Sequence, residues 1–205
     1  MTVRPFLVNG EWRTGESSFE VHSPYDDAVV AEIGVPGAED VEEAIAAAAQ
    51  TFEEARRLPI HVRADALDHI SRRLAESIDE NAELIAKEGG KPLKWAKVEA
   101  TRAVSTFRWA SEILRRGDDE LIRLDTEASL GSRVGLIRRF AYGPVLGITP
   151  FNFPLNLVCH KVGPALAGGN AVIIKPASDT PLSALKLTEI LLEAGLPAEG
   201  IQCLT

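Results

Sequence analysis

Hydrophobic residues from Val145 onward alternate between two patterns along the chain. Short apolar runs with β-branched members are typical of buried strands, and apolar residues spaced three or four positions apart are typical of helices. Gly168-Gly169-Asn170 is a turn signal, and Thr180 followed by Pro181 is typical of a helix start, with Thr180 as N-cap. The pattern predicts strand, helix, strand, helix and strand over residues 145–149, 155–167, 171–175, 182–194 and 201–204.

The chain before this region predicts a hairpin, helices and an exposed arm. Phe6 to Arg13 contains an Asn-Gly turn between two short strand signals, and a further strand is expected near Val29 to Ile33. Two amphipathic helices and one longer helix ending near Gly117 should follow, and then a loop or extended arm and a partly exposed strand. The apolar stripes are 41, 45, 48, 52, then 67, 70, 74, 78, then 95, 98, 107, 110, 114; the arm is 118–132 and the exposed strand 133–140.

A strand, a helix and a second strand in the same sheet form a right-handed unit with parallel strands. The carboxyl ends of such strands lie on one rim, where open α/β sheets bind ligands. Asn152 and Lys175 follow or end the first two strands, so we expect them to share that rim. The sequence therefore predicts an α/β fold with a ligand site there.

Composition narrows the class of protein. The chain has 205 residues, of which 45% are hydrophobic, enough to bury a sizeable core. A net charge of -8 disfavours nucleic acid and anionic membranes as partners. Two cysteines favour a reducing compartment, and no signal peptide or membrane span is apparent. A cytoplasmic protein is expected, without a metal site.

The last expected strand, residues 201–204, bears on completeness. A sheet that stops at its third short strand leaves an edge, and α/β domains normally pair or cover their edges. We therefore expect the sequence to be truncated, and expect an isolated fragment to expose this edge and aggregate.

Several motifs resemble the aldehyde dehydrogenase superfamily in order and spacing. They are ITPFNFP (148–154), GPALAGGN (163–170), IKPAS (174–178), EGGKP (88–92) and the NGEW hairpin (9–12). Members of that family are more than twice as long, and their nucleophilic cysteine, general-base glutamate and second glycine-rich phosphate motif lie beyond the matching part. The resemblance thus covers about the first two fifths of such an enzyme.

The resemblance implies a fold and a division of the chain. The fold would be α/β, with an incomplete Rossmann-like parallel sheet, an N-terminal hairpin and a helical region. Residues 1–120 would supply the hairpin and helices of the cofactor domain, and 121–142 an oligomerisation arm. Residues 143–205 would form the first βαβαβ part of the cofactor-binding sheet.

The resemblance also assigns roles at the rim. Asn152 would stabilise an oxyanion, although an asparagine at this place could instead satisfy its own turn. Lys175 would bind the adenosine ribose, although a lysine can also snorkel at a strand end. The remaining cofactor-binding positions implied are Ile148, Thr149, Pro150, Phe151 and Ser178.

Ser178 departs from many NAD-preferring relatives, which place a glutamate there. A carboxylate would repel a 2'-phosphate, whereas a serine can donate a hydrogen bond. We therefore expect NADP to be accepted alongside NAD, although Asp179 could restore some repulsion. The chain contains no G-x-G-x-x-G, so the cofactor assignment depends on the resemblance.

Other candidates lie on the helix expected after the first strand. Cys159 is expected to be a buried hydrophobe rather than a nucleophile, and Cys203 likewise. Phe153, Leu157 and His160 follow helical spacing, and the matching family positions line the substrate tunnel. A histidine there favours a small hydroxylated or anionic aldehyde, with a plain core or surface histidine as the alternative.

The main functional hypothesis is an oxidoreductase that converts aldehydes to carboxylic acids with NAD or NADP, as a homo-oligomer. In such enzymes a cysteine thiolate attacks the aldehyde and hydride passes to the nicotinamide. The 205-residue chain alone is expected to be inactive. The alternatives are a truncated, non-catalytic nucleotide-binding or subunit-pairing protein, and a relative that transfers the acyl group to coenzyme A.

Overall fold

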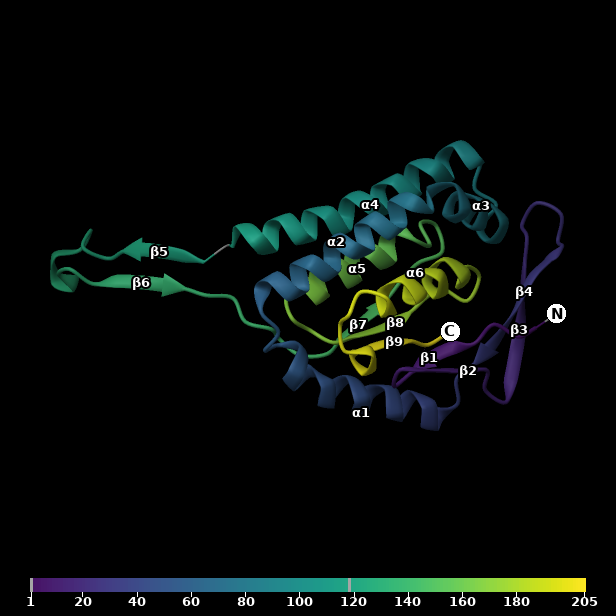
Figure 1. The fold of residues 1–205 in the computed structure, drawn as a ribbon, viewed down its shortest axis with the longest axis horizontal. Helices are drawn as coiled ribbons and strands as arrows, with labels where there is room; N and C mark the ends of the chain where they lie inside the picture. The colour runs from purple at the N-terminus through teal and green to yellow at the C-terminus, as the bar shows by residue number, and fades with distance from the viewer. Residues whose placement is uncertain (1, 118) are drawn as a thin grey trace.

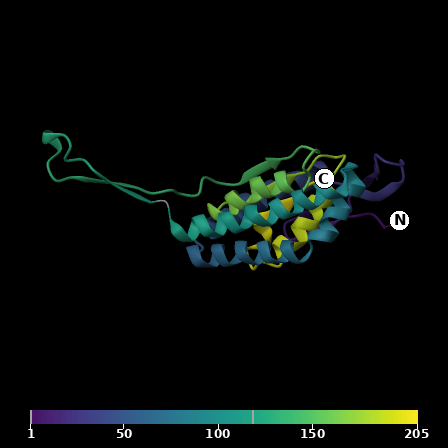
Figure 2. The ribbon, with the colours of Figure 1, turned by 90° about the horizontal axis from the view of Figure 1, so that it is seen from above.

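The computed structural model describes residues 2–117 and 119–205 (Figure 1). A mixed α/β core carries a long two-stranded arm that projects away from it (Figure 1, Figure 2). The helices are α1 (Ala38–Ala55), α2 (Ile60–Glu76), α3 (Ile78–Gly89), α4 (Leu93–Arg116), α5 (Asn156–Ala167) and α6 (Leu182–Leu192), with short 3-10 turns η1 (Ala128–Leu130) and η2 (Ala198–Gly200). The strands are β1 (Phe6–Val8), β2 (Glu11–Arg13), β3 (Ser17–His22), β4 (Val29–Val35), β5 (Glu120–Arg123), β6 (Val134–Ile137), β7 (Val145–Ile148), β8 (Val172–Lys175) and β9 (Ile201–Cys203).

The main sheet has the strand order β2-β1-β9-β8-β7. β7, β8 and β9 are parallel and joined by α5 and α6, which confirms the expected α/β fold with a partial Rossmann-like sheet. The Asn9-Gly10 hairpin is also confirmed, and its strand β1 joins the sheet antiparallel to β9. The expected free edge at the third parallel strand is therefore wrong, because β1 pairs with that edge.

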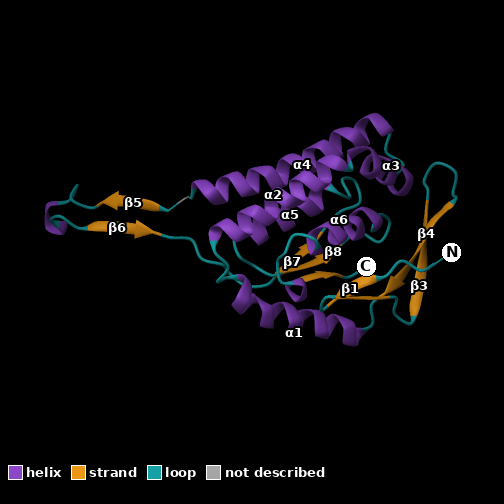
Figure 3. Cartoon of the chain, viewed as in Figure 1, coloured by secondary structure: helices purple, strands orange, loops and turns teal. Residues whose placement is uncertain are grey.

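Helices cover the two faces of this sheet unequally. Along β8, Val172 and Ile174 pack into the large core that is shared with α2, α4, α5 and α6. Ala171 and Ile173 face the other way, toward α1. Figure 3 shows helices on both sides of the sheet. The alternation of buried side chains along the strand is the period of two that a strand imposes when both faces are covered.

The cover on the α1 face does not extend over β7. Leu146 pairs with Ile173 and Ile148 with Lys175, but the side chains of Leu146 and Ile148 are 60% and 65% exposed. The carboxyl end of β7 therefore presents apolar surface at the rim where a ligand site is expected.

The structure corrects two details of the upstream pattern. Ile78 does not continue the stripe of the preceding helix; α2 ends at Glu76 and α3 begins at Ile78, with Ser77 between them. Strand β3 was not expected, and it pairs with β4. Gly90 ends α3 with φ +64°, a left-handed conformation that glycine adopts without strain.

The region expected to be a loop or extended arm is a two-stranded ribbon. β5 pairs antiparallel with β6, from Glu120 opposite Ile137 to Arg123 opposite Val134. Both strands are largely exposed, including Leu121, Val134 and Leu136. Figure 2 shows the ribbon extending well beyond the helices, so its apolar side chains lack cover in the described part of the chain. None of the described helices is long and apolar enough to span a membrane.

Candidate active site

The two strands that end at the expected site are in matching register. Ile148 pairs with Lys175, and the backbone N–H of Thr149 donates to the carbonyl of Lys175 over 3.1 Å. β7 and β8 therefore end together on one rim, as the sequence predicts for parallel neighbours. Pro150 and Phe151 continue from β7 as exposed residues, and Asn152 follows them.

Asn152 lies in the short segment that links β7 to α5. Its backbone carbonyl accepts a hydrogen bond of 2.7 Å from Lys91 Nζ. Its side chain is exposed and makes no hydrogen bond to any described residue, so the alternative of an asparagine that caps its own turn finds no support in the geometry. The amide keeps two N–H donors that could meet a developing negative charge.

The start of α5 is held by a buried carboxylate. Glu99 Oε1 accepts hydrogen bonds from the backbone N–H groups of Leu155 (3.0 Å) and Asn156 (3.2 Å). Glu99 Oε2 pairs with Lys91, so one carboxylate joins a cation and a helix N-terminus. On the other side of the helix start, Thr106 donates to Asn156 Oδ1 over 3.3 Å.

The start of α6 is held in the same manner by Glu88. The backbone N–H of Leu182 donates to Glu88 Oε2 over 2.7 Å, and that of Ser183 donates to Oε1 over 3.0 Å, with the Ser183 hydroxyl also donating to Oε1. Burial raises the pKa of Glu88 to about 7, although these hydrogen bonds oppose the shift.

This arrangement corrects the expected start of α6. Pro181 is the N-cap rather than the first helical residue, and Thr180 does not cap the helix. The buried Thr180 hydroxyl has no hydrogen-bond partner among the described residues. Glu88, which is distant in sequence, performs the capping that the local pattern assigned to Thr180.

Lys175 and Ser178 lie at and just beyond the end of β8. Lys175 is half-buried, and its Nζ donates to the carbonyl of Pro176 over 2.7 Å. Ser178 and Asp179 are both exposed. A lysine donor and a serine hydroxyl at a strand end could contact ribose hydroxyls, and the serine places no carboxylate against a 2'-phosphate.

The three residues expected to line a substrate path are partly open to solvent. The N–H of Leu157 donates to the carbonyl of Phe153 over 3.1 Å, so Phe153 lies one helical turn before Leu157. His160 is exposed on α5, which favours its surface alternative over a core position. Two cationic groups lie over the Phe153 ring. Lys91 Nζ is 3.8 Å from the ring centroid, and the Arg102 guanidinium is 5.7 Å from it.

Both cysteines are free and buried, as expected. Burial raises the pKa of the Cys159 thiol above its ordinary value and that of Cys203 to about 12. A thiol acts as a nucleophile in its thiolate form, so neither cysteine is suited to attack an aldehyde.

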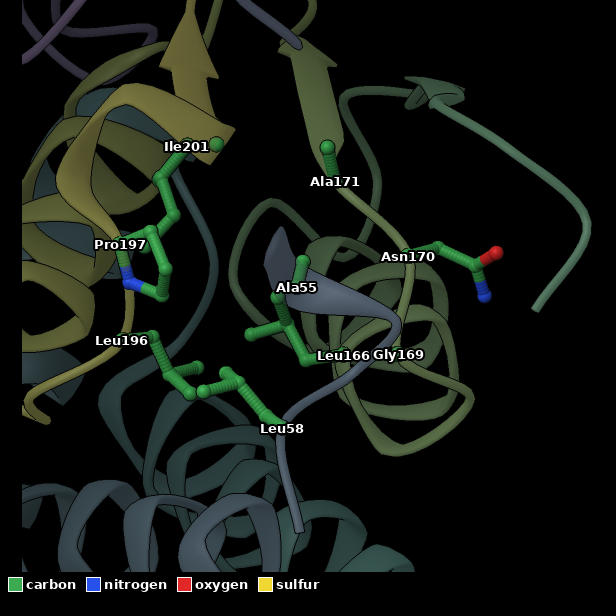
Figure 4. A pocket seen from close by; sticks show the side chains of 10 residues that line it. Ala55, Leu58, Leu166, Gly169, Asn170, Ala171, Leu196, Pro197 and Ile201 are labelled. Carbon is green, nitrogen blue, oxygen red and sulfur yellow. The ribbon is translucent and has the colours of Figure 1, made fainter. Parts of the chain in front are cut away.

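Two cavities lie away from the rim. A small apolar cavity of about 20 Å³ lies at the amino ends of β8 and β9, lined by Ala55, Leu166, Pro197 and other residues drawn in Figure 4. The labelled Asn170 side chain points away from it and accepts hydrogen bonds from the N–H groups of Tyr142 and Gly143. A larger cavity of about 500 Å³ lies between the N-terminal residues, α3 and α6. Neither is lined by the residues expected at the site.

Sequence reasoning did not assign chemistry to Lys91, Glu88 or Glu99. The first two belong to the EGGKP motif, which contributed to the family resemblance only as a pattern. Glu99 lies in an amphipathic helix, where a glutamate is ordinarily taken as solvent-exposed. A buried charge is visible only once its distant partners are placed beside it.

An α/β domain with parallel strands and polar groups at their carboxyl rim belongs to the class of folds that bind nucleotides and similar ligands there. The sequence matches the model of the aldehyde dehydrogenase family over residues 12–205. The chain belongs to this family.

Individual relatives cover nearly all of the chain. A 3-sulfolactaldehyde dehydrogenase of Priestia aryabhattai is 39% identical over 202 residues, which are 97% of this chain and 41% of the relative. The crystal structure of NADP-dependent glyceraldehyde-3-phosphate dehydrogenase from Bacillus halodurans C-125, complexed with NADP, is 33% identical with a TM-score of 0.93, over 100% of this chain and 44% of that one.

A third match is aldehyde dehydrogenase 21 from Physcomitrella patens, solved in complex with the reaction product succinate. It is 34% identical with a TM-score of 0.92, over 98% of this chain and 42% of that one. The chain thus spans between 41% and 44% of the length of these three relatives.

Proposed function

We propose that this chain forms part of an enzyme that oxidises a small aldehyde to its acid with NAD or NADP, and that Asn152 supplies an oxyanion donor. The observation that carries this proposal is the exposed Asn152 amide, which lacks a partner in the described residues at the carboxyl rim of a family-typical sheet. A donor aimed at a developing oxyanion typically contributes a factor of about 10² to 10³ in rate.

The residues at the rim fit a nicotinamide dinucleotide. The exposed apolar end of β7 offers a surface for the cofactor through Ile148, Pro150 and Phe151, with the buried Thr149 between them. Lys175 and Ser178 would hold the adenosine ribose. When bound, the cofactor would accept hydride from the substrate.

Ser178 is the basis for proposing that NADP is accepted as well as NAD. Its hydroxyl is exposed and brings no negative charge toward a 2'-phosphate, and one of the similar structures was solved with NADP. Substituting Ser178→Glu should lower the preference for NADP over NAD by about fivefold in kcat/KM, because one repelled charge near a surface contributes on the order of 1 kcal/mol. A cofactor preference that is the same in this variant and in the unsubstituted enzyme would contradict the role.

The proposed substrate class rests on three partly open residues just before and on α5. Phe153, Leu157 and His160 would line the aldehyde path, and a histidine favours a hydroxylated or anionic aldehyde. Two of the relatives are named for sulfolactaldehyde and glyceraldehyde-3-phosphate, and the third was solved with its reaction product succinate; all three compounds are small and anionic. The test measures kcat/KM of the unsubstituted enzyme and of His160→Ala with anionic and with neutral aldehydes. An unchanged preference for one class of aldehyde over the other would count against this role of His160.

The direct test uses the product of the complete reading frame. It should reduce NAD or NADP in the presence of a small aldehyde, and Asn152→Ala should lower kcat by about 10² to 10³. A rate that depends on added coenzyme A would favour the acylating alternative. The 205-residue chain alone should be inactive, because its two cysteines are both buried with raised pKa values.

The arm supports a second proposal, that this segment pairs subunits. Leu121 and Leu136 lie opposite each other in the ribbon and are 68% and 66% exposed. Exposed apolar side chains on a projecting ribbon are typical of an interface. Leu136→Asp should shift the mass measured by light scattering toward the monomer, whereas Arg133→Asp should not; an unchanged mass for Leu136→Asp would contradict this role.

The cytoplasmic location stays a prediction.

A further inference from the structure

The segment that carries Asn152 is fixed at both ends by one pair of charged residues. Lys91 Nζ donates to the Asn152 carbonyl over 2.7 Å. Glu99 accepts from the N–H groups of Leu155 and Asn156 over 3.0 and 3.2 Å, and it is ion-paired with Lys91. The carbonyl at the beginning of the segment and the amides at its end therefore share a single anchor.

This anchor is shielded from water. The Glu99 side chain is fully buried and that of Lys91 is 16% exposed. Between the two anchored ends lies Phe153, whose ring centroid is 3.8 Å from Lys91 Nζ. Charge-assisted hydrogen bonds in a low-dielectric setting are shorter and stronger than neutral ones, so the pair restrains the backbone on either side of Phe153.

We propose that Lys91 and Glu99 are positioning residues, which hold the Asn152 backbone so that its side-chain amide is aimed at the reacting carbonyl oxygen. The proposal rests on the function proposed above. Lys91 bonds the backbone carbonyl of Asn152 and leaves the side-chain amide available for substrate. A misplacement of about 1 Å in such a group can lower a rate by about a hundredfold.

The decisive experiment is a double-mutant cycle on the product of the complete reading frame. Lys91→Met should lower kcat by about 10 to 100-fold with little change in the KM for the cofactor, because the aim of the amide is lost while the cofactor surface remains. In the Asn152→Ala background the same substitution should have no further effect on kcat. Asn152→Ala keeps the backbone carbonyl, so a purely structural contribution of Lys91 would persist in that background.

Two further variants keep the test interpretable. Lys97→Met is the matched control, because Lys97 forms an exposed ion pair with Asp79, with 2.7 Å between Lys97 Nζ and Asp79 Oδ1. This control variant should leave kcat unchanged. Glu99→Gln keeps an oxygen acceptor for the α5 amides but weakens the hold on Lys91, so it should fold and lower kcat by about tenfold if Lys91→Met proves unstable. An equal loss from Lys91→Met in both Asn152 backgrounds would overturn the proposal.

A second readout is independent of activity. In the product of the complete reading frame with labelled asparagine, the backbone N–H of Asn152 should be ordered by heteronuclear NMR relaxation, because Lys91 holds the backbone there. It should become mobile in Lys91→Met and stay ordered in Lys97→Met. If the enzyme shows no aldehyde oxidation, the functional proposal fails while this result still decides the positioning role. A backbone N–H of Asn152 that is equally ordered in Lys91→Met would reject that role.

Discussion

The helices α5 and α6 begin alike, yet their two glutamates have different partners. Glu99 divides its carboxylate between Lys91 and the amides of α5. Glu88 has no paired cation among the described residues and gives both oxygens to the start of α6. The comparison shows that a distant glutamate can cap a helix in two ways. At α5 the capping glutamate is also linked, through Lys91, to the loop after β7, whereas at α6 the capping glutamate bonds the helix start alone.

The largest effect on the free energy of unfolding should come from removing Glu99, the capping carboxylate that is ion-paired with Lys91. Glu99→Ala leaves the largely buried Lys91 without its ion-pair partner and the backbone N–H groups of Leu155 and Asn156 without an acceptor. Breaking one side of a buried pair typically lowers the free energy of unfolding by about 3–5 kcal/mol. Urea denaturation of the 205-residue chain would measure this.

The control on the same helix is Glu112→Ala. Glu112 pairs with Arg108 at 3.6 Å on the exposed face of α4, so its loss should lower the free energy of unfolding by less than about 1 kcal/mol. Similar losses for Glu99→Ala and Glu112→Ala would mean that the buried cap at α5 contributes no more than a surface pair.

The second effect is a pH dependence that belongs to α6. The pKa of Glu88 is raised from 4.5 to about 7 in the folded protein, so between these values the folded state binds more protons than the unfolded state. The contribution of Glu88 is therefore fully present below about pH 4.5, falls as the pH rises, and is lost above about pH 7. Each pKa unit corresponds to about 1.4 kcal/mol, which makes the whole change on the order of 3 kcal/mol.

Comparison with Glu88→Gln isolates this contribution from other titrating groups. Stability should be measured by denaturation at several pH values between 4 and 8, a range of about four units that covers the window for one buried carboxyl. The difference in free energy between parent and Glu88→Gln should shift against the parent as the pH rises. A difference that is constant with pH would show that Glu88 does not titrate in this window.

The smallest effect, and one of opposite sign, is expected at Thr180. Its buried hydroxyl has no partner among the described residues, because Glu88 serves the helix start instead. Thr180→Val should raise the free energy of unfolding by about 1 kcal/mol, because it removes an unsatisfied polar group. Thr188→Val is the control, since the Thr188 hydroxyl donates to the Ala184 carbonyl over 2.8 Å. A loss of stability from Thr180→Val as large as that from Thr188→Val would show that the Thr180 hydroxyl is satisfied.

The elements of the sheet could be predicted because their signals are local. Strands β7, β8 and β9 are short apolar runs, and glycine follows the end of each helix between them within a few residues. Strand β3 was missed because only Phe19 and Val21 mark it among exposed polar residues. The split at Ser77 was missed because Ile78 continues the helical spacing across it.

The anchors of the candidate site could not be predicted because their partners are far apart. Glu99 meets Leu155 at a separation of 56 residues, and Glu88 meets Leu182 at 94. No periodicity spans such distances, and a charged residue in an amphipathic helix is ordinarily taken to face water. The residues at the rim could be placed because a parallel register fixes them.

The pairing of β1 with β9 has a consequence for the order of folding. The N–H of Asn9 donates to Gln202 Oε1 across a separation of 193 residues, and Leu7 lies opposite Cys203. During synthesis, residues near the N-terminus emerge first, yet their place in the sheet exists only after β9 has been made. Closing so long a loop is entropically unfavourable and gains its contacts last. Strand β1 therefore waits for β9, which is synthesised much later, before it can join the sheet.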